Sequence, residues 1–324
     1  MDTLKRIRPT PKVAPSPEPT PPSRSPRVKG AYRVLGFLAG ALIALPVIGL
    51  TAVGPVPFDE MKSALTLPYE LRDATFLTVT GDQRYILKRA GWWWFEDIDS
   101  SDRFMGPIVR TRDGLIASIT RDSTMAPQLV VNGVLAASLP PHATGLAVSP
   151  DGTKFAYAYL DNADAARFND PTAWAVGVYD YALQRTFEAA RGFAPFFVDD
   201  THLARATAAG VQSLDFATAE YVRLRDTPFV VATPEAERSP DGSLVALANP
   251  GLNQTTVYRI SPTDLTVVAT YPVIISNAAL GPNALYEVRA LESGTEIWKY
   301  PFDGSAPTRI HTFPVSIRVL SLSL

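Results

Sequence analysis

The sequence contains no cysteine. Disulfides therefore cannot stabilise the chain, and catalysis or metal binding through a thiolate is excluded. If the chain lies outside the cytoplasm, its lack of disulfides is typical of a bacterial or archaeal envelope protein and less common in a eukaryotic secreted protein.

Histidine is scarce, and the sequence patterns of several enzyme classes are missing. His142, His202 and His311 stand far apart, so no two have the short spacing of a metal-binding pair. The chain has no G-x-S-x-G nucleophile elbow and no glycine-rich loop that would hold a phosphate. The sequence thus gives little support to a metal centre or a histidine-based relay, and we expect no cofactor.

Charge is absent from a long stretch near the N-terminus. Residues 34–58 read VLGFLAGALIALPVIGLTAVGPVPF and carry no charged side chain. A helix of this length extends roughly 37 Å at about 1.5 Å per residue, more than the roughly 30 Å hydrocarbon core of a bilayer. The pattern predicts a transmembrane helix over residues 31–55, with the lipid bilayer as its partner.

Charge is divided unequally on the two sides of this stretch. The first 33 residues hold eight lysines and arginines against two acidic residues, whereas the remainder of the chain has a net charge of −8. Basic flanks stay cytoplasmic, so we expect a cytoplasmic N-terminus and a large extracytoplasmic part in the cell membrane. A cleaved signal peptide is the alternative, but its basic region would be unusually long. The negative charge also argues against nucleic acid as a partner.

Proline dominates the predicted cytoplasmic tail. Eight prolines fall within residues 9–26, a composition that forms extended, solvated chain rather than a packed core. We expect a disordered tail at 1–30, the transmembrane helix at 31–55, a linker at 56–72 and one domain at 73–324.

Internal repeats indicate the fold of that domain. Ser-Pro-Asp-Gly occurs at 149–152 and again at 239–242, and each copy precedes an alternating strand, KFAYAYL or SLVALAN. Weaker versions of this turn and strand occur around positions 82, 113, 199 and 283, at spacings of about 42 residues. Asp and Gly accept the backbone conformations of tight turns. We predict structural turns at Asp113, Gly114, Asp151, Gly152, Asp241 and Gly242.

A unit of about 42 residues with four strands is typical of a β-propeller blade. The available length predicts an all-β fold with six blades, or seven as the alternative. The short spacing after Asp82 predicts a trimmed first blade. Residues 315–324 alternate up to the last residue, so we expect this strand to close the ring against the N-terminal blade.

The Ser-Pro-Asp-Gly turn before such a strand resembles the WD-like repeat of the TolB-type propellers, which also occurs in the propeller domain of prolyl oligopeptidase-type enzymes. The resemblance covers 149–160 and 239–249 best. It implies the propeller fold. It implies no function, because the chain has no room for the hydrolase domain of the peptidases and lacks the extra α/β domain of TolB.

Two local clusters are candidates for binding. Asp161, Asp164 and Asp170 lie in an expected insertion between the second and third strands of one blade. This insertion either binds a metal ion such as calcium or is a surface loop without a ligand. The aromatic run from Trp92 to Phe95 favours packing between blades over stacking on sugars.

These observations leave two classes of function open. The first is a non-catalytic binding or scaffold module, anchored in the membrane of the cell envelope, that holds an unidentified protein or polymer. The alternative is an enzyme, a metal-assisted hydrolase or one acting on polysaccharides, with its site at the axial entrance. That alternative requires Asp, Glu or His from three or more blades to converge on the axis.

Overall fold

The computed structural model describes residues 58–324 apart from 83, 93–94, 102–104, 112–113 and 162–163. The predicted tail and transmembrane helix lie outside these residues. Within the described part, no helix has the length and apolar character needed to cross a bilayer.

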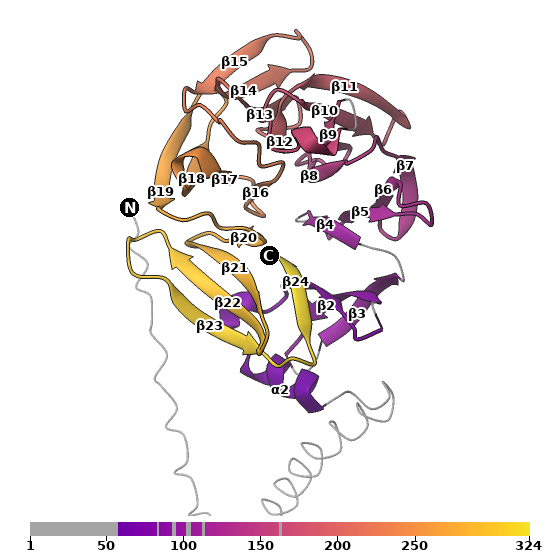
Figure 1. Cartoon of the computed structure of the whole chain (residues 1–324), viewed down its shortest axis with the longest axis vertical. Coiled ribbons are helices and arrows are strands. Elements are labelled where there is room, and N and C mark those ends of the chain that lie inside the picture. The colour runs from indigo at the N-terminus through magenta and orange to yellow at the C-terminus, as the bar shows by residue number, and fades with distance from the viewer. Residues whose placement is uncertain (1–57, 83, 93–94, 102–104, 112–113, 162–163) are drawn as a thin grey trace, which may run out of the picture. The chain divides into compact units, whose positions relative to one another are not determined.

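Six four-stranded antiparallel sheets surround a common axis as the blades of a propeller (Figure 1). Blades 1 to 3 consist of β24 (Arg318–Ser323), β1 (Thr75–Val79), β2 (Tyr85–Ala90) and β3 (Phe95–Ser101); β4 (Met105–Arg110), β5 (Ile116–Arg121), β6 (Pro127–Val131) and β7 (Val134–Ser138); and β8 (Thr144–Val148), β9 (Lys154–Leu160), β10 (Trp174–Asp180) and β11 (Arg185–Arg191).

Blades 4 to 6 consist of β12 (Phe193–Phe197), β13 (His202–Thr207), β14 (Gly210–Asp215) and β15 (Tyr221–Arg225); β16 (Ala236–Arg238), β17 (Leu244–Asn249), β18 (Gln254–Ile260) and β19 (Leu265–Tyr271); and β20 (Ala278–Leu280), β21 (Ala284–Leu291), β22 (Gly294–Pro301) and β23 (Thr308–Phe313). The first strand named in each blade is the innermost. The prediction of an all-β, six-bladed propeller is confirmed.

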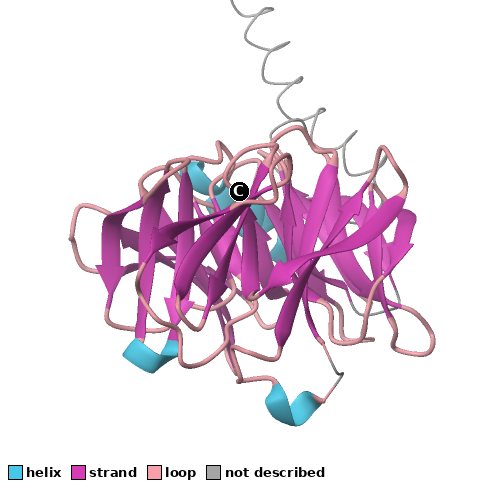
Figure 2. Cartoon of the chain, turned by 90° about the horizontal axis from the view of Figure 1, so that it is seen from above, coloured by secondary structure: helices cyan, strands magenta, loops and turns pink. Residues whose placement is uncertain are grey.

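The strands run between two loop-bearing ends of the propeller (Figure 2). We call the end that holds the turns after the inner strands, including 149–152 and 239–242, the mouth end. The opposite end, which we call the base end, holds the loops after the second strands and the connections to the next blade. Two short helices, η2 (Ala165–Arg167) and η3 (Pro250–Leu252), lie in loops of the base end.

The C-terminal strand closes the ring. β24 pairs with β1 in antiparallel register, from Thr75 opposite Ser323 to Val79 opposite Arg318. Ile317 and Val319 are buried as alternation requires, and Leu322 is also buried because the register of β24 shifts by one residue between Val319 and Ser321. The prediction that residues 315–324 pair with the N-terminal blade is therefore confirmed.

The first blade is complete, and the expectation of a trimmed blade is wrong. Asp82 lies in the turn between β1 and β2, which are the second and third strands of blade 1. In the other blades the matching Asp or Asn follows the first strand. The spacing from Asp82 to Asp113 is short because Asp82 follows the second strand of its blade, whereas Asp113 follows the first strand of the next blade. The inner strand of blade 1 is β24, from the other end of the chain.

A helical segment seals the junction between the last blade and the first. α2 (Phe58–Thr66) and η1 (Tyr69–Leu71) occupy most of the predicted linker, and α2 packs against β3 and β23 (Figure 1). Leu67 and Leu71 are buried there in one apolar cluster with Phe76 and Phe313. The segment thus contributes to the core of the ring.

The repeated turns follow from their side chains. Gly152 and Gly242 have φ of +70° and +72°, and in each turn the Asp carboxylate accepts a 3.0 Å hydrogen bond from the backbone N–H two residues on. Gly114 has φ +85°, while Asp113 lies outside the described residues. Each of these turns leads the chain from the inner strand into the second strand of its blade.

Candidate functional site

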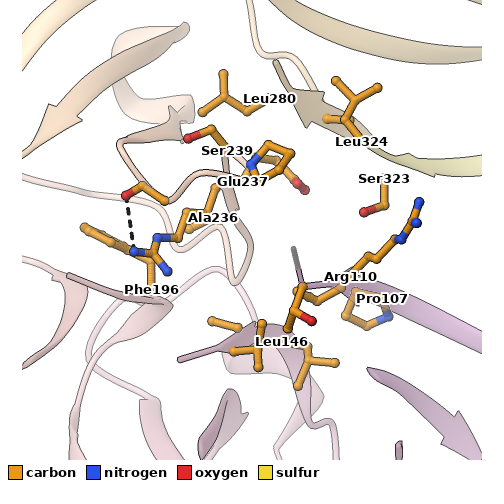
Figure 3. Close-up of a pocket in the computed structure, with 18 of the residues that line it drawn as sticks. Pro107, Arg110, Leu146, Phe196, Ala236, Glu237, Ser239, Leu280, Ser323 and Leu324 are labelled. Carbon is orange, nitrogen blue, oxygen red and sulfur yellow. Dashed lines mark hydrogen bonds between the residues drawn. The ribbon is translucent and has the colours of Figure 1, made fainter. Parts of the chain in front are cut away.

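A cavity of about 280 Å³ lies on the axis, among the inner strands (Figure 3). It reaches the turns at 149–150 and 239–242, so it extends to the mouth end. All six blades contribute lining residues, among them Pro107, Arg110, Leu146, Phe196, Glu235, Glu237, Leu280 and Leu322. Most of these side chains are apolar, so the charged ones determine what the cavity can bind.

The two carboxylates come from one strand. Glu235 and Glu237 are two residues apart, and alternation along a strand places such residues on the same face. Here that is the face of β16 toward the cavity. Glu235 accepts a 3.4 Å hydrogen bond from the Thr144 hydroxyl, whereas Glu237 has no hydrogen bond or ion pair within the described part of the chain. Two acids therefore face the axis without a cation paired to them.

Their surroundings disfavour the charged form. Burial raises the pKa of Glu237 to about 8, and repulsion from Glu235 adds to this rise. Burial also raises the pKa of Glu235, and its hydrogen bond from Thr144 opposes part of that shift. Both side chains still touch the open cavity, so a ligand can reach them. An entering cation would pair with these carboxylates and favour loss of their protons.

The arginines at the cavity are already held by the protein. Arg238 donates to the carbonyl oxygens of Val198 at 3.3 Å and Gly242 at 3.2 Å. Arg110 donates to the Asp73 carbonyl oxygen at 2.7 Å, which ties blade 2 to the start of blade 1. Burial lowers the pKa of both guanidinium groups. Figure 3 shows Arg110 across the cavity from Glu237, on the side of Ser323.

The cavity is narrowed toward the base end by a close backbone contact. Gly145 of β8 has φ +62°, and a Cβ built on it would lie 1.9 Å from the Pro234 carbonyl oxygen. The same carbonyl accepts a 3.1 Å hydrogen bond from the Ala194 N–H. Glycine is required here because any side chain would separate the inner strands of blades 3 and 5.

Glu237→Gln should make the protein more stable at high pH. Because the pKa is raised on folding, the neutral form favours the fold, and stability is lost as pH rises from the unfolded value near 4.5 toward 8. Gln removes this penalty. We expect a gain of about 1–3 kcal/mol at pH 8.5 and no difference at pH 4, measured by urea unfolding.

Glu292→Gln is the matched control, since Glu292 is exposed at the base end. It should change stability little at either pH. If Glu237→Gln and the unaltered protein had the same free energy of unfolding at pH 8.5, ionisation of Glu237 in the folded protein would cost no stability.

The acidic insertion lies where the sequence places it, between the second and third strands of blade 3. Asp161 pairs with Arg191 at 2.5 Å, and Asp164 caps η2 by accepting from the Ala166 N–H. Asp170 accepts from Thr172 and Arg167, and these bonds lower its pKa to about 2. No three His, Asp or Glu side chains gather as metal ligands in the described residues; Asn162 and Ala163 lie outside them. Calcium at this loop stays a prediction.

The axial arrangement differs from the one required by the enzyme alternative. The described carboxylates that line the cavity, Glu235, Glu237 and Asp241, all belong to blade 5 or its turn. His202 instead contacts Asp199 at 2.9 Å in a turn of the mouth end. His311 lies between β22 and α2, where burial lowers its pKa to about 4. Neither histidine lines the cavity.

The aromatic run divides between core and surface. Phe95 is buried, but Trp92 is 65% exposed and packs edge-on against Tyr69, beside Arg72. The expectation of packing between blades is therefore wrong for Trp92. Trp93 and Trp94 lie outside the described residues.

Sequence reasoning missed Glu235 and Glu237. A signal was present: Pro-Glu-Ala-Glu-Arg at 234–238 places two acids at alternate positions just before a Ser-Pro-Asp-Gly turn, whereas the matching Gly-Leu-Ala-Val before the other such turn is apolar. An inner strand with two acids on one face indicates a polar axis.

Known structures with similar architecture confirm the fold. TolB from Acinetobacter baumannii matches over 79% of this chain and 67% of its own, with a TM-score of 0.58 and 13% identity. A chain of the nidogen/laminin complex matches over 77% of this chain and 97% of its own, with a TM-score of 0.51 and 8% identity. This chain has the β-propeller architecture that TolB contains. No protein-family model matches the sequence, and no curated protein does. At these identities the likeness concerns the fold alone.

Proposed function

We propose that this protein is a non-catalytic binding module, anchored in the cell membrane by residues 31–55 with its propeller outside the cytoplasm. Its binding site is the mouth of the axial cavity, and its ligand is a protein partner that inserts a cationic side chain between the blades.

The location rests on the sequence. The uncharged stretch is long enough to span a bilayer, and the basic residues lie on its N-terminal side. The propeller begins immediately after this stretch, so the tether between membrane and domain is short. A binding domain held this way samples a narrow layer outside the membrane, which raises its effective concentration for partners in that layer.

The single observation that carries the binding site is the carboxyl group of Glu237, which lies beside Glu235 in the axial cavity without a cationic partner among the described residues. An unpaired acid in such a place costs stability, and a cationic ligand would remove that cost. A lysine side chain suits the cavity because its apolar stem can contact Leu280 and Leu322 while its ammonium reaches the two acids.

Peptide binding tests the site. An acetylated and amidated Gly-Lys-Gly-containing peptide should bind the full-length protein in detergent, measured by chemical-shift changes of residues that line the cavity. Affinity should rise between pH 6 and pH 8.5, because binding requires Glu237 to lose its proton. Glu237→Gln should weaken binding about tenfold, the size of a lost charged hydrogen bond.

Two controls make this decisive. The same peptide with norleucine in place of lysine should bind more weakly, since it retains the stem but lacks the charge. Glu292→Gln removes a charge at the opposite end and should leave binding unchanged. Equal binding of the two peptides would contradict the cation site.

A further inference from the structure

Charge is unevenly distributed among the loops of the propeller. The described turns of the mouth end carry Asp151, Asp199, Asp200, Glu220, Asp241, Asp264 and Asp303, and the segment that leads into β1 adds Asp73 and Arg72, whose guanidinium donates to the carbonyl oxygens of Gly91 and Trp92. Several base-end loops carry no charge at all, namely those at 208–209, 250–253, 272–277 and 314–317 and the segment 227–234. These segments belong to blades 4 to 6 and the closure to blade 1. The connection 139–143 is also without Asp, Glu, Lys or Arg, while the other described base-end loops of blades 1 to 3 carry Asp82, Arg84, Asp122, Asp161, Asp164, Arg167 and Asp170.

The uncharged loops of blades 4 to 6 and of the closure expose large apolar side chains. Val230, Leu252, Val273 and Val315 stand at their tips, and Leu291 ends β21 nearby; they are 37–68% exposed. The loops also meet one another, since a Cβ on Gly251 would lie 2.2 Å from the Val230 Cγ2 atom. We call these five residues the base patch. Arg318 is exposed beside them, at the start of β24.

The polypeptide enters the propeller at this same end. The Ser316 hydroxyl donates a 2.9 Å hydrogen bond to Asp59 at the start of α2, in the loop that carries Val315. Only two residues separate position 58 from the predicted transmembrane helix, so positions 55 and 58 are at most about 10 Å apart at about 3.5 Å per residue. The mouth end is about 20 Å further, the length of a strand of six residues at about 3.3 Å each.

We infer that the base patch rests on the outer surface of the bilayer, with its apolar tips among the lipid headgroups and acyl-chain ends. This inference depends on the membrane anchor of the proposed function. The exposed apolar tips of the uncharged loops gain free energy in that layer and Arg318 suits anionic lipid headgroups, whereas the Glu292 carboxylate beside Leu291 stays in the aqueous part of the interface. The acidic mouth end is repelled by the same anionic surface. Docking at the base therefore holds the axial cavity open toward partners away from the membrane.

Lipid quenching tests the docking in the full-length protein, whose lack of cysteine allows single-site labels. Val273→Cys and Leu252→Cys, each carrying an environment-sensitive fluorophore, are reconstituted in phosphatidylethanolamine and phosphatidylglycerol vesicles with nitroxide-labelled lipid. We expect quenching of both labels at least about twofold stronger than that of Ala306→Cys in the mouth-end loop of blade 6. Replacing Val230, Val273 and Val315 by serine should reduce quenching at Leu252→Cys, with no loss of thermal stability.

The outcomes separate this inference from the anchor. Recovery of the protein free of vesicles would contradict the proposed membrane anchor. Vesicle-bound protein whose base-end and mouth-end labels are quenched equally would overturn the docking alone. Energy transfer between base-end labels on separate copies, without lipid quenching, would assign the base patch to self-association and also overturn it.

Discussion

Removal of residues 318–324 should prevent the propeller from closing. β24 supplies the inner strand of blade 1, pairs with β1 along its length and buries Val319 and Leu322. At roughly 1.5–3 kcal/mol for each large apolar side chain, and with the ladder to β1 also lost, the cost approaches the whole stability of a domain, about 5–15 kcal/mol. We expect the truncated protein to aggregate or to melt far below the intact protein, as measured by size exclusion and thermal unfolding.

Two substitutions serve as graded controls for the truncation. Val319→Ala keeps the strand but removes buried methyl groups, and should cost about 1–2 kcal/mol. Val315→Ala alters an exposed loop residue and should cost almost nothing. A truncated protein that stays monomeric with an unchanged melting temperature would show that the ring does not depend on this strand.

Gly145→Ala should cost at least about 3 kcal/mol. An alanine at φ +62° is strained by about 1–2 kcal/mol, and its Cβ would stand 1.9 Å from the Pro234 carbonyl oxygen. Relief requires the inner strands of blades 3 and 5 to separate, which breaks the contact that narrows the cavity. Thermal unfolding would show a lowered melting temperature.

Gly81→Ala is the matched control, because no described atom lies within 4 Å of the added Cβ and its φ is not in the left-handed region. It should leave the melting temperature within a degree or two. Equal stability of the two alanine variants would contradict the close approach of β8 to Pro234.

The turns could be predicted because their chemistry is local. Asp151 and Gly152 specify a tight turn from their own side chains, and the same is true of Asp241 and Gly242. The blade assignment at Asp82 failed for the opposite reason. Its blade receives an inner strand from the far end of the chain, so no neighbouring residue reveals which strand follows that turn.

The candidate site depended on pairing that the sequence alone does not show. Glu235 and Glu237 read as ordinary surface charges until β16 is known to be an inner strand. Conversely, Asp161 and Asp170 form an acidic cluster in sequence, but in the fold each meets an arginine of its own. The spacing of charges along the chain is therefore a poor guide to the site. What decides it is which strands lie next to the axis, and the sequence does not show this directly.

Site-specific labelling tests most directly whether this is a membrane-anchored propeller outside the cytoplasm. Single cysteines are placed at Ala306, in the propeller, and at Ser16, in the N-terminal tail, and intact spheroplasts are treated with a membrane-impermeant maleimide. The membrane-bound protein should be labelled at position 306 without detergent and at position 16 only after detergent is added. Labelling of position 16 in intact spheroplasts with position 306 protected, or release of a soluble propeller, would contradict the account.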